Sequence, residues 1–302
     1  GVQNSRAIDD LVVEAKRLAD SGVRELILVA QDLTAYGVDL ADRPQLHDLV
    51  AALAALDGIS WIRLMYAYPR NIKPALIDLM ANHPKVLPYL DMPIQHSHGA
   101  MLKRMNRGTH PDKIRTILRK LKKDVPGLIM RTTFIVGYPG ETQEEFDDLY
   151  EFVEEMEFHR VGVFRYSQEE GTPAALLPDQ VSEKVKTERQ EALMTLQATI
   201  HRKHNEALIG QTVDVLVDGV SEETELLLQG RSIGQAPEID GITYINDGWA
   251  DPGDLVRIRI EEVHDYDIVG GIEAVLRPAA TRLPDGAGLN ILGSAAHPED
   301  LR

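Results

Sequence analysis

The 302-residue sequence contains no cysteine. The chain alone therefore cannot form a disulfide, offer a thiolate nucleophile, or ligate an iron–sulfur cluster or zinc through sulfur. Long hydrophobic runs are also missing, since the longest, at 49–56, is far short of the ~18 apolar residues that span a membrane. The polar first ten residues do not resemble a signal peptide. We expect a cytoplasmic protein without a membrane partner.

Positive charge is scarce. The chain has 32 Lys and Arg against 48 Asp and Glu, a net charge of −16. Because phosphate contacts need Lys and Arg, this balance disfavours broad binding to nucleic acid or anionic lipid. The remaining composition, 43% hydrophobic and 26% charged, is ordinary for a globular chain with a sizeable core. The length predicts two domains, or one large domain with an appendage.

Between residues 7 and 208, helical periodicity alternates with short apolar runs. The expected strands lie at 25–30, 61–66, 86–92, 128–136 and 161–166. Right-handed crossovers between such strands predict a parallel α/β sheet or a partial (β/α) barrel, and strands that are apolar throughout indicate cover on both faces. Thr142 and Glu145 form a T-x-x-E capping box, which predicts a helix start.

After Gly210 the pattern changes to a period of two, as in Val213, Val215 and Val217, with Gly and Asp between the runs. This pattern predicts a small antiparallel β-barrel. From 277 onward the chain is rich in Pro, Gly and Ala without periodicity, which is typical of a tail. We therefore expect domains at 1–208 and 209–276, followed by a tail at 277–302.

Functional groups of parallel α/β barrels lie on loops after the carboxyl ends of strands. Four such loops, 31–37, 66–70, 93–98 and 137–142, carry polar residues. The glycine-rich loop 137–142 lets backbone approach a ligand, although a tight connection before a capped helix explains it equally well. Two further features fit either chemistry or structure.

The first is His96-x-His98, because imidazoles two apart on an extended segment point to one side and can share a metal ion. No matching lysine or carboxylate follows, so we favour solvated or substrate-facing histidines. The second is the charge of Asp91 and Arg131 inside expected strands. Such charges must form an ion pair or face a polar cavity, and the sequence leaves both open.

Six groups of residues, in the correct order, resemble the radical S-adenosylmethionine methylthiotransferases. They are 1–6 with VAQD at 29–32 and AYG at 35–37, YLDMPIQH at 89–96, RTTFIVGYPGET at 131–142, FRYS at 164–167 with EGTPA at 170–174, GRS at 230–232 with APEIDG at 236–241, and DYD at 265–267. The resemblance covers residues 1–272 and includes an appended TRAM domain. The last two groups are similar to the branch that modifies a small-subunit ribosomal protein.

This resemblance implies a partial barrel of radical SAM type that binds S-adenosylmethionine at its strand ends. In the full-length enzyme it implies two [4Fe-4S] clusters, a 5′-deoxyadenosyl radical, and methylthiolation of the β-carbon of an aspartate in a small-subunit ribosomal protein. The residues implied to line the cofactor and substrate cavity are Gln31, Gln95, Ser97 and Arg131. Those implied to flank the adenosine are Gly137, Pro139, Gly140, Glu141 and Tyr166, where Glu141 has helix capping as its alternative role. No catalytic residue follows.

The family's three-cysteine motif, first barrel strand and amino-terminal domain are expected upstream of Gly1, so this chain alone is expected to be inactive and to hold no cluster. Alternatives are the tRNA-modifying branch, a cluster-less module that docks on a ribosomal protein, and a metal-dependent hydrolase using His96 and His98. The expected barrel carries three arginines against fifteen carboxylates. Such a surface predicts a basic small-subunit ribosomal protein as partner and no direct nucleic acid.

Overall fold

The computed structural model describes residues 4–279, so the expected tail lies outside the described residues from 280 onward. Five strands form one parallel sheet in sequence order, with every neighbouring pair parallel. They are β1 (Glu25–Leu28), β2 (Trp61–Leu64), β3 (Val86–Asp91), β4 (Ile129–Val136) and β5 (Arg160–Arg165). The predicted parallel α/β architecture is confirmed, with predicted strand ends that differ by one or two residues.

In the described part of the chain, one α-helix precedes these strands and six connect or follow them. They are α1 (Ile8–Asp20), α2 (Leu46–Ala54), α3 (Pro74–Asn82), α4 (Gly99–Arg104), α5 (Pro111–Asp124), α6 (Gln143–Met156) and α7 (Glu183–Glu206). Short 3₁₀ turns are η1 (Leu33–Ala35), η2 (Pro69–Asn71) and η3 (Pro173–Leu176). None of the helices in residues 4–279 is long and apolar enough to cross a membrane.

The predicted capping box starts α6. The Thr142 hydroxyl accepts a hydrogen bond from the Glu145 N–H at 3.2 Å, and the Glu145 carboxylate accepts one from the Thr142 N–H at 2.9 Å. Phe146, Leu149 and Val153 on the same helix are buried against the sheet. The cap therefore determines where the helix begins and which stripe faces the core.

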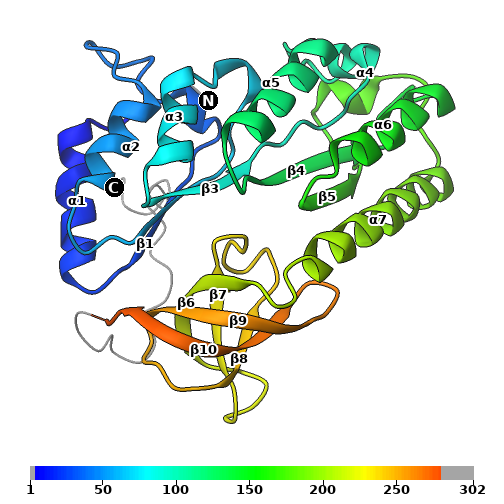
Figure 1. The fold of residues 1–302 in the computed structure, drawn as a ribbon. Coiled ribbons are helices and arrows are strands. Elements are labelled where there is room, and N and C mark those ends of the chain that lie inside the picture. The colour runs from blue at the N-terminus through cyan, green and yellow to red at the C-terminus, as the bar shows by residue number, and fades with distance from the viewer. Residues whose placement is uncertain (1–3, 280–302) are drawn as a thin grey trace.

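The sheet is covered by helices on one face (Figure 1). Buried and half-buried positions alternate along β1 and β4. The expected cover on both faces is found at β2 and β3, where the C-terminal barrel covers the inner face, although that inner face is not apolar throughout. That face carries Arg63, Asp91 and Arg131 among its apolar residues, and it meets the C-terminal barrel. The charges are tolerated because each has a partner of opposite charge.

The C-terminal strands are β6 (Thr212–Val220), β7 (Leu228–Ser232), β8 (Thr243–Asp247), β9 (Leu255–Val263) and β10 (Ile268–Arg277). They close into a barrel in the order β10-β8-β7-β6-β9. Four pairings are antiparallel and the β8–β10 pairing is parallel, which corrects the purely antiparallel prediction. A closed ring with an odd number of strands cannot alternate in direction throughout, so one parallel pair is unavoidable.

The main apolar core lies between the sheet and its helices, and a separate apolar cluster joins the barrel to the sheet. Trp61, Leu87 and Tyr89 of the sheet contact Leu216 and Ala236 of the barrel. Near the other end of the chain, Arg24 donates to the carbonyl of Pro278 at 3.0 Å, and Arg277 donates to the hydroxyl of Ser60 at 3.1 Å. The end of the last barrel strand is thus tied to the start of the sheet.

Candidate functional site

A cavity of about 280 Å³ opens at the carboxyl ends of the sheet strands. Its lining comes from the loops after β1, β2 and β3, from the segment between α4 and α5, from β4, and from the end of β5. The lining residues are Gln31, Tyr66, Ala67, Tyr68, Pro93, Gln95, Arg107, Arg131, Thr133 and Phe164. Three of the four residues expected to line a cofactor and substrate cavity, Gln31, Gln95 and Arg131, therefore lie together.

Gln95 is held at the cavity by its backbone. Its N–H donates to the Thr133 carbonyl at 2.8 Å, and its carbonyl accepts from the Ile135 N–H at 2.9 Å. Its φ of +74° lies in the left-handed region, which costs a non-glycine residue free energy and is common at binding sites. The side-chain Oε1 is buried without a hydrogen-bond partner within residues 4–279. This buried acceptor is therefore open to a donor from a ligand or a water molecule.

Arg131 both forms an ion pair and lines the cavity, which answers the choice that the sequence left open. One terminal nitrogen lies 3.0 Å from Asp91 Oδ1, and the side chain of Asp91 is fully buried. Burial raises the pKa of Asp91, while Arg131 and the Tyr66 N–H lower it. The pair therefore places a guanidinium at the cavity wall with a buried carboxylate behind it.

Ser97 and Glu141 do not line this cavity. The Ser97 hydroxyl donates to Asp148 on α6. Glu141 accepts from the Gly137 N–H, lies 2.8 Å from Arg189 on α7, and its Oε1 lies 3.2 Å from His96 Nε2. Both side chains already have hydrogen-bond partners within the protein, and Glu141 ties the 137–142 turn to α7 rather than capping α6.

Tyr166 lies at a neighbouring cavity of about 610 Å³, and Phe164 lines both cavities. The Tyr166 hydroxyl is buried and has no hydrogen-bond partner among the described residues. Gly137 adopts a φ of +72°, and a Cβ there would lie 2.2 Å from Lys186 Cγ, so only glycine fits. In the same turn Pro139 is buried and Gly140 donates to the Asp179 carbonyl at 2.9 Å. The residues that the resemblance implies to flank the adenosine thus lie beside the second cavity.

His96 and His98 do not converge on one point. His96 contacts Glu141, whereas His98 Nδ1 lies 3.5 Å from Glu145. The expected extended geometry is lost because Gln95 turns the chain and His98 is already the N-cap residue of α4. Within residues 4–279, no group of three His, Asp or Glu side chains is arranged to hold a metal ion.

Sequence reasoning missed Tyr68, Arg107 and Phe164 as lining residues. The guanidiniums of Arg107 and Arg70 lie 5.9 and 5.7 Å from the centre of the Tyr68 ring. In the described part of the chain neither guanidinium lies in an ion pair, although the protein is strongly acidic. The sequence marked loop 66–70 as a polar strand end and placed Phe164 in the FRYS group. No sequence pattern pointed to Arg107.

Three arginines of the barrel, unlike Arg107 and Arg70, lie in ion pairs. Arg231 lies 3.1 Å from Glu25 and 3.3 Å from Asp218. Arg257 pairs with Asp214 at 2.8 Å, and Arg259 pairs with Glu273 at 2.6 Å. Arg231, Arg257 and Arg259 are therefore each paired with a carboxylate, Arg277 at the end of β10 donates to Ser60, and the excess of acid remains.

Known proteins match both parts of the chain. The Radical SAM superfamily matches residues 1–153, and the TRAM domain matches residues 209–272. The chain belongs to the Radical SAM superfamily. Within it, the chain is a homologue of ribosomal protein uS12 methylthiotransferase RimO. It is 52% identical over 301 residues to RimO of Anaeromyxobacter sp. (strain K), covering 97% of this chain and 64% of that protein. It is 54% identical over 272 residues to RimO of Myxococcus xanthus, covering 90% and 57%.

The chain thus spans about three-fifths of the length of these relatives. Among solved structures, coproporphyrinogen III oxidase (HemN) from Escherichia coli matches at 16% identity with a TM-score of 0.47, over 66% of this chain and 46% of that one.

The superfamily implies S-adenosylmethionine and a [4Fe-4S] cluster. The residues present do not fit the cluster, because the chain has no cysteine. They do fit S-adenosylmethionine, because the cavity presents the unfilled Gln95 oxygen beside the guanidiniums of Arg131 and Arg107. Amide groups suit hydroxyl and amino donors, and guanidiniums suit a carboxylate.

Proposed function

We propose that this chain is the part of a RimO-type methylthiotransferase that holds S-adenosylmethionine and the substrate. In the full-length enzyme, which would carry two [4Fe-4S] clusters, the reaction is methylthiolation of the β-carbon of an aspartate in ribosomal protein uS12. One observation carries the proposal: Gln31, Gln95 and Arg131 converge on one cavity in a chain about half identical to RimO proteins.

Each lining residue has a role that its chemistry supports. Gln31 and Gln95 orient the hydroxyl and amino groups of the bound molecule, and Gln95 is fixed in place by β4. Arg131 and Arg107 hold carboxylates, either of the cofactor or of the substrate aspartate. Tyr166 and the turn at Gly137, across Phe164, form the adenosine side. S-adenosylmethionine supplies the hydrogen-abstracting group and the methyl group when bound.

The barrel is proposed to hold the basic substrate protein. Its acidic surface attracts a positively charged chain and raises the association rate at low salt. RNA is a poor fit, because Arg231, Arg257 and Arg259 of the barrel are already paired with carboxylates and Arg277 donates to Ser60.

S-adenosylmethionine binding to the chain, measured by calorimetry, tests the cavity. Gln95→Ala is expected to weaken binding by about tenfold, since it removes hydrogen bonds to the ligand. The matched control is Gln143→Ala, an exposed glutamine at the start of α6 that lies outside both cavities. In a longer protein that includes the cluster cysteines, Gln95→Ala should reduce turnover far more than it lowers the melting temperature. Equal affinity of the two variants, or normal turnover with lost stability, would make Gln95 a scaffold residue.

A further inference from the structure

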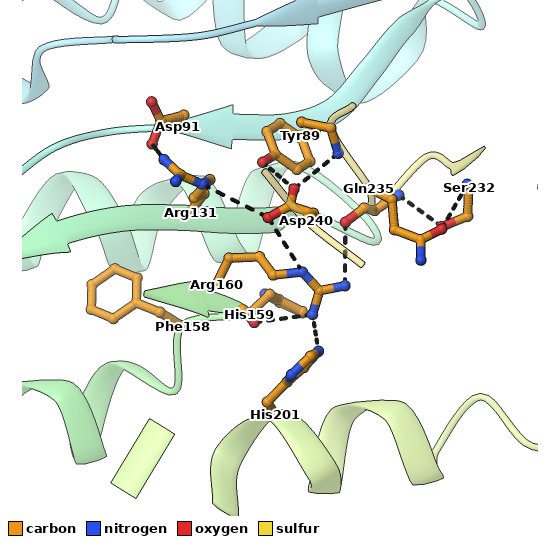
Figure 2. A network of polar contacts seen from close by, with 12 residues as sticks. Tyr89, Asp91, Arg131, Phe158, His159, Arg160, His201, Ser232, Gln235 and Asp240 are labelled. Carbon is orange, nitrogen blue, oxygen red and sulfur yellow. Dashed lines mark hydrogen bonds and ion pairs between the residues drawn. The ribbon is translucent and has the colours of Figure 1, made fainter. Parts of the chain in front are cut away.

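The loop between β7 and β8, residues 233–242, leaves the barrel and packs under the sheet. Ala236 of this loop is buried in the apolar cluster that contains Tyr89. Asp240, at the far end of the loop, has a side chain that is 2% exposed. Figure 2 shows its carboxylate between Tyr89, Arg131 and Arg160, which come from three neighbouring sheet strands. A residue of the barrel is thus inserted among side chains of the sheet.

The orientation of the Asp240 carboxylate is determined by two hydrogen bonds to one oxygen. Oδ2 accepts from the Tyr89 hydroxyl at 2.7 Å and from the Ala236 N–H at 2.9 Å. The other oxygen, Oδ1, lies 3.8 Å from Arg131 Nε and 3.7 Å from Arg160 Nε. One carboxylate therefore lies within ion-pair distance of two guanidiniums.

Arg131 lies between two acids, one from each domain. Its terminal nitrogen contacts Asp91 of the sheet, and its Nε faces Asp240 of the loop (Figure 2). Burial would lower the pKa of Arg131, but Asp91, Tyr89 and Asp240 together raise it. Because the same guanidinium lines the cavity with Gln31 and Gln95, the two acids determine the position of its charge toward a ligand.

Asp240 also pairs with Arg160. This second interaction must be distinguished from the effect of Asp240 on Arg131. Arg160 donates to the carbonyls of His159 and Gly234 and contacts His201, and Asp240 is its carboxylate partner among the described residues. A role through Arg160 alone affects docking of the barrel and stability. A role through Arg131 affects the cavity, so the two roles have different readouts.

We propose that Asp240 is a positioning residue that acts through Arg131, so that a residue of the C-terminal barrel completes the cavity at the strand ends. The part of its test that measures ligand binding rests on the proposed function, whereas the geometric argument does not. The barrel is then part of the cofactor and substrate site, in addition to its proposed role toward the ribosomal protein.

S-adenosylmethionine binding to the 302-residue chain is the first readout. Asp240→Asn keeps the size of the side chain and removes its charge, and it is expected to weaken binding by about tenfold, the scale of coupling between close buried charges. The control is Asp267→Asn, because Asp267 accepts from the Ile242 N–H at 2.7 Å and anchors the same loop without touching a guanidinium. In an Arg131→Gln background, Asp240→Asn should cause no further loss of affinity. Additive losses, or an equal loss in the control, would overturn the proposal.

The side-chain Nε–H resonance of Arg131, observed by NMR with ¹⁵N-arginine and assigned by its loss in Arg131→Gln, is a readout without ligand. It should shift in Asp240→Asn and stay in place in Asp267→Asn. If the unmodified chain does not bind S-adenosylmethionine, the proposed function fails and this resonance still decides the role of Asp240. If Asp240→Asn does not fold, Tyr89→Phe removes one bond to Asp240 while keeping every charge, and it should shift the same resonance. An Arg131 resonance that is unchanged in each folded variant contradicts the proposal.

Discussion

The sheet and the barrel manage charge in opposite ways. At the mouth of the sheet cavity, Arg70 and Arg107 flank Tyr68 without an ion pair in the described residues. On the barrel, Arg231, Arg257 and Arg259 are paired, and many carboxylates are exposed without a cation partner among residues 4–279, for example Glu222, Glu225 and Glu238. One surface offers unpaired positive charge and the other unpaired negative charge.

The difference indicates two kinds of ligand for one chain. Unpaired guanidiniums beside a cavity favour a small molecule or side chain with a carboxylate. Unpaired carboxylates spread over a barrel favour a basic macromolecule, with binding that salt weakens. Between the two surfaces lies a third arrangement, in which buried acids and arginines of the two domains neutralise each other.

The largest expected effect comes from breaking that buried arrangement. Glu25 lies 2.7 Å from Arg63, whose side chain is fully buried, and 3.1 Å from Arg231 of the barrel. Glu25→Gln leaves buried guanidiniums short of a negative charge and should lower the free energy of unfolding by about 3–5 kcal/mol. Urea denaturation measures the loss. Asp214→Asn, which breaks an exposed pair on the barrel, is the control and should cause no measurable change; equal stability of both variants would contradict this view of the junction.

The second effect concerns acid. Burial, with Arg160 next in importance, lowers the pKa of His201 to about 3, and burial likewise lowers the pKa of His159 to about 3. The pKa of histidine in an unfolded chain is about 6.5. The contribution of the two neutral histidines to stability is therefore complete above that pH and is lost as the pH falls toward 3. His201→Gln does not titrate and should reduce the drop in melting temperature between pH 7 and pH 5.

His110→Gln is the matched control for that comparison, since His110 is exposed at the start of α5. Its melting temperatures should follow those of the unmodified protein at each pH. A pH dependence in His201→Gln as steep as in the control would show that the histidines at the junction are already free to take up protons.

The smallest effect concerns the acidic surface. Replacing Glu222, Glu225 and Glu238 by Gln should weaken binding of basic uS12 severalfold at low salt, and the difference should shrink as salt is added. Fluorescence titration measures it. The same change of charge at Glu144, Glu151 and Glu154, exposed on α6, is the control and should have less effect. Binding of tRNA in place of uS12 would favour the tRNA-modifying branch.

Much of the backbone was predictable because hydrophobic period and caps are local properties. Side-chain partners were harder. Gln31, Gln95 and Arg131 were expected from the strand-end rule and the family resemblance, and they line the cavity. Ser97 was expected on the same grounds but lies outside it, because the left-handed backbone at Gln95 turns the following residues toward α6. The Tyr89–Asp240 bond joins residues 151 positions apart, and no local pattern encodes such a distance. A usable signal was present in Arg63, since a single arginine in an apolar strand requires a buried partner.

The bond between Arg24 and Pro278 has a kinetic consequence. It joins residues 254 positions apart and closes nearly the whole described chain into one loop. The free-energy cost of closing a loop grows slowly with its length, by about 0.6 kcal/mol for each doubling. The length of this loop therefore has little effect on stability at equilibrium. Its effect on rate is greater, because contacts between distant residues slow folding. Docking of the barrel onto the sheet is therefore expected to be the last and slowest step, after each domain has collapsed on its own local contacts.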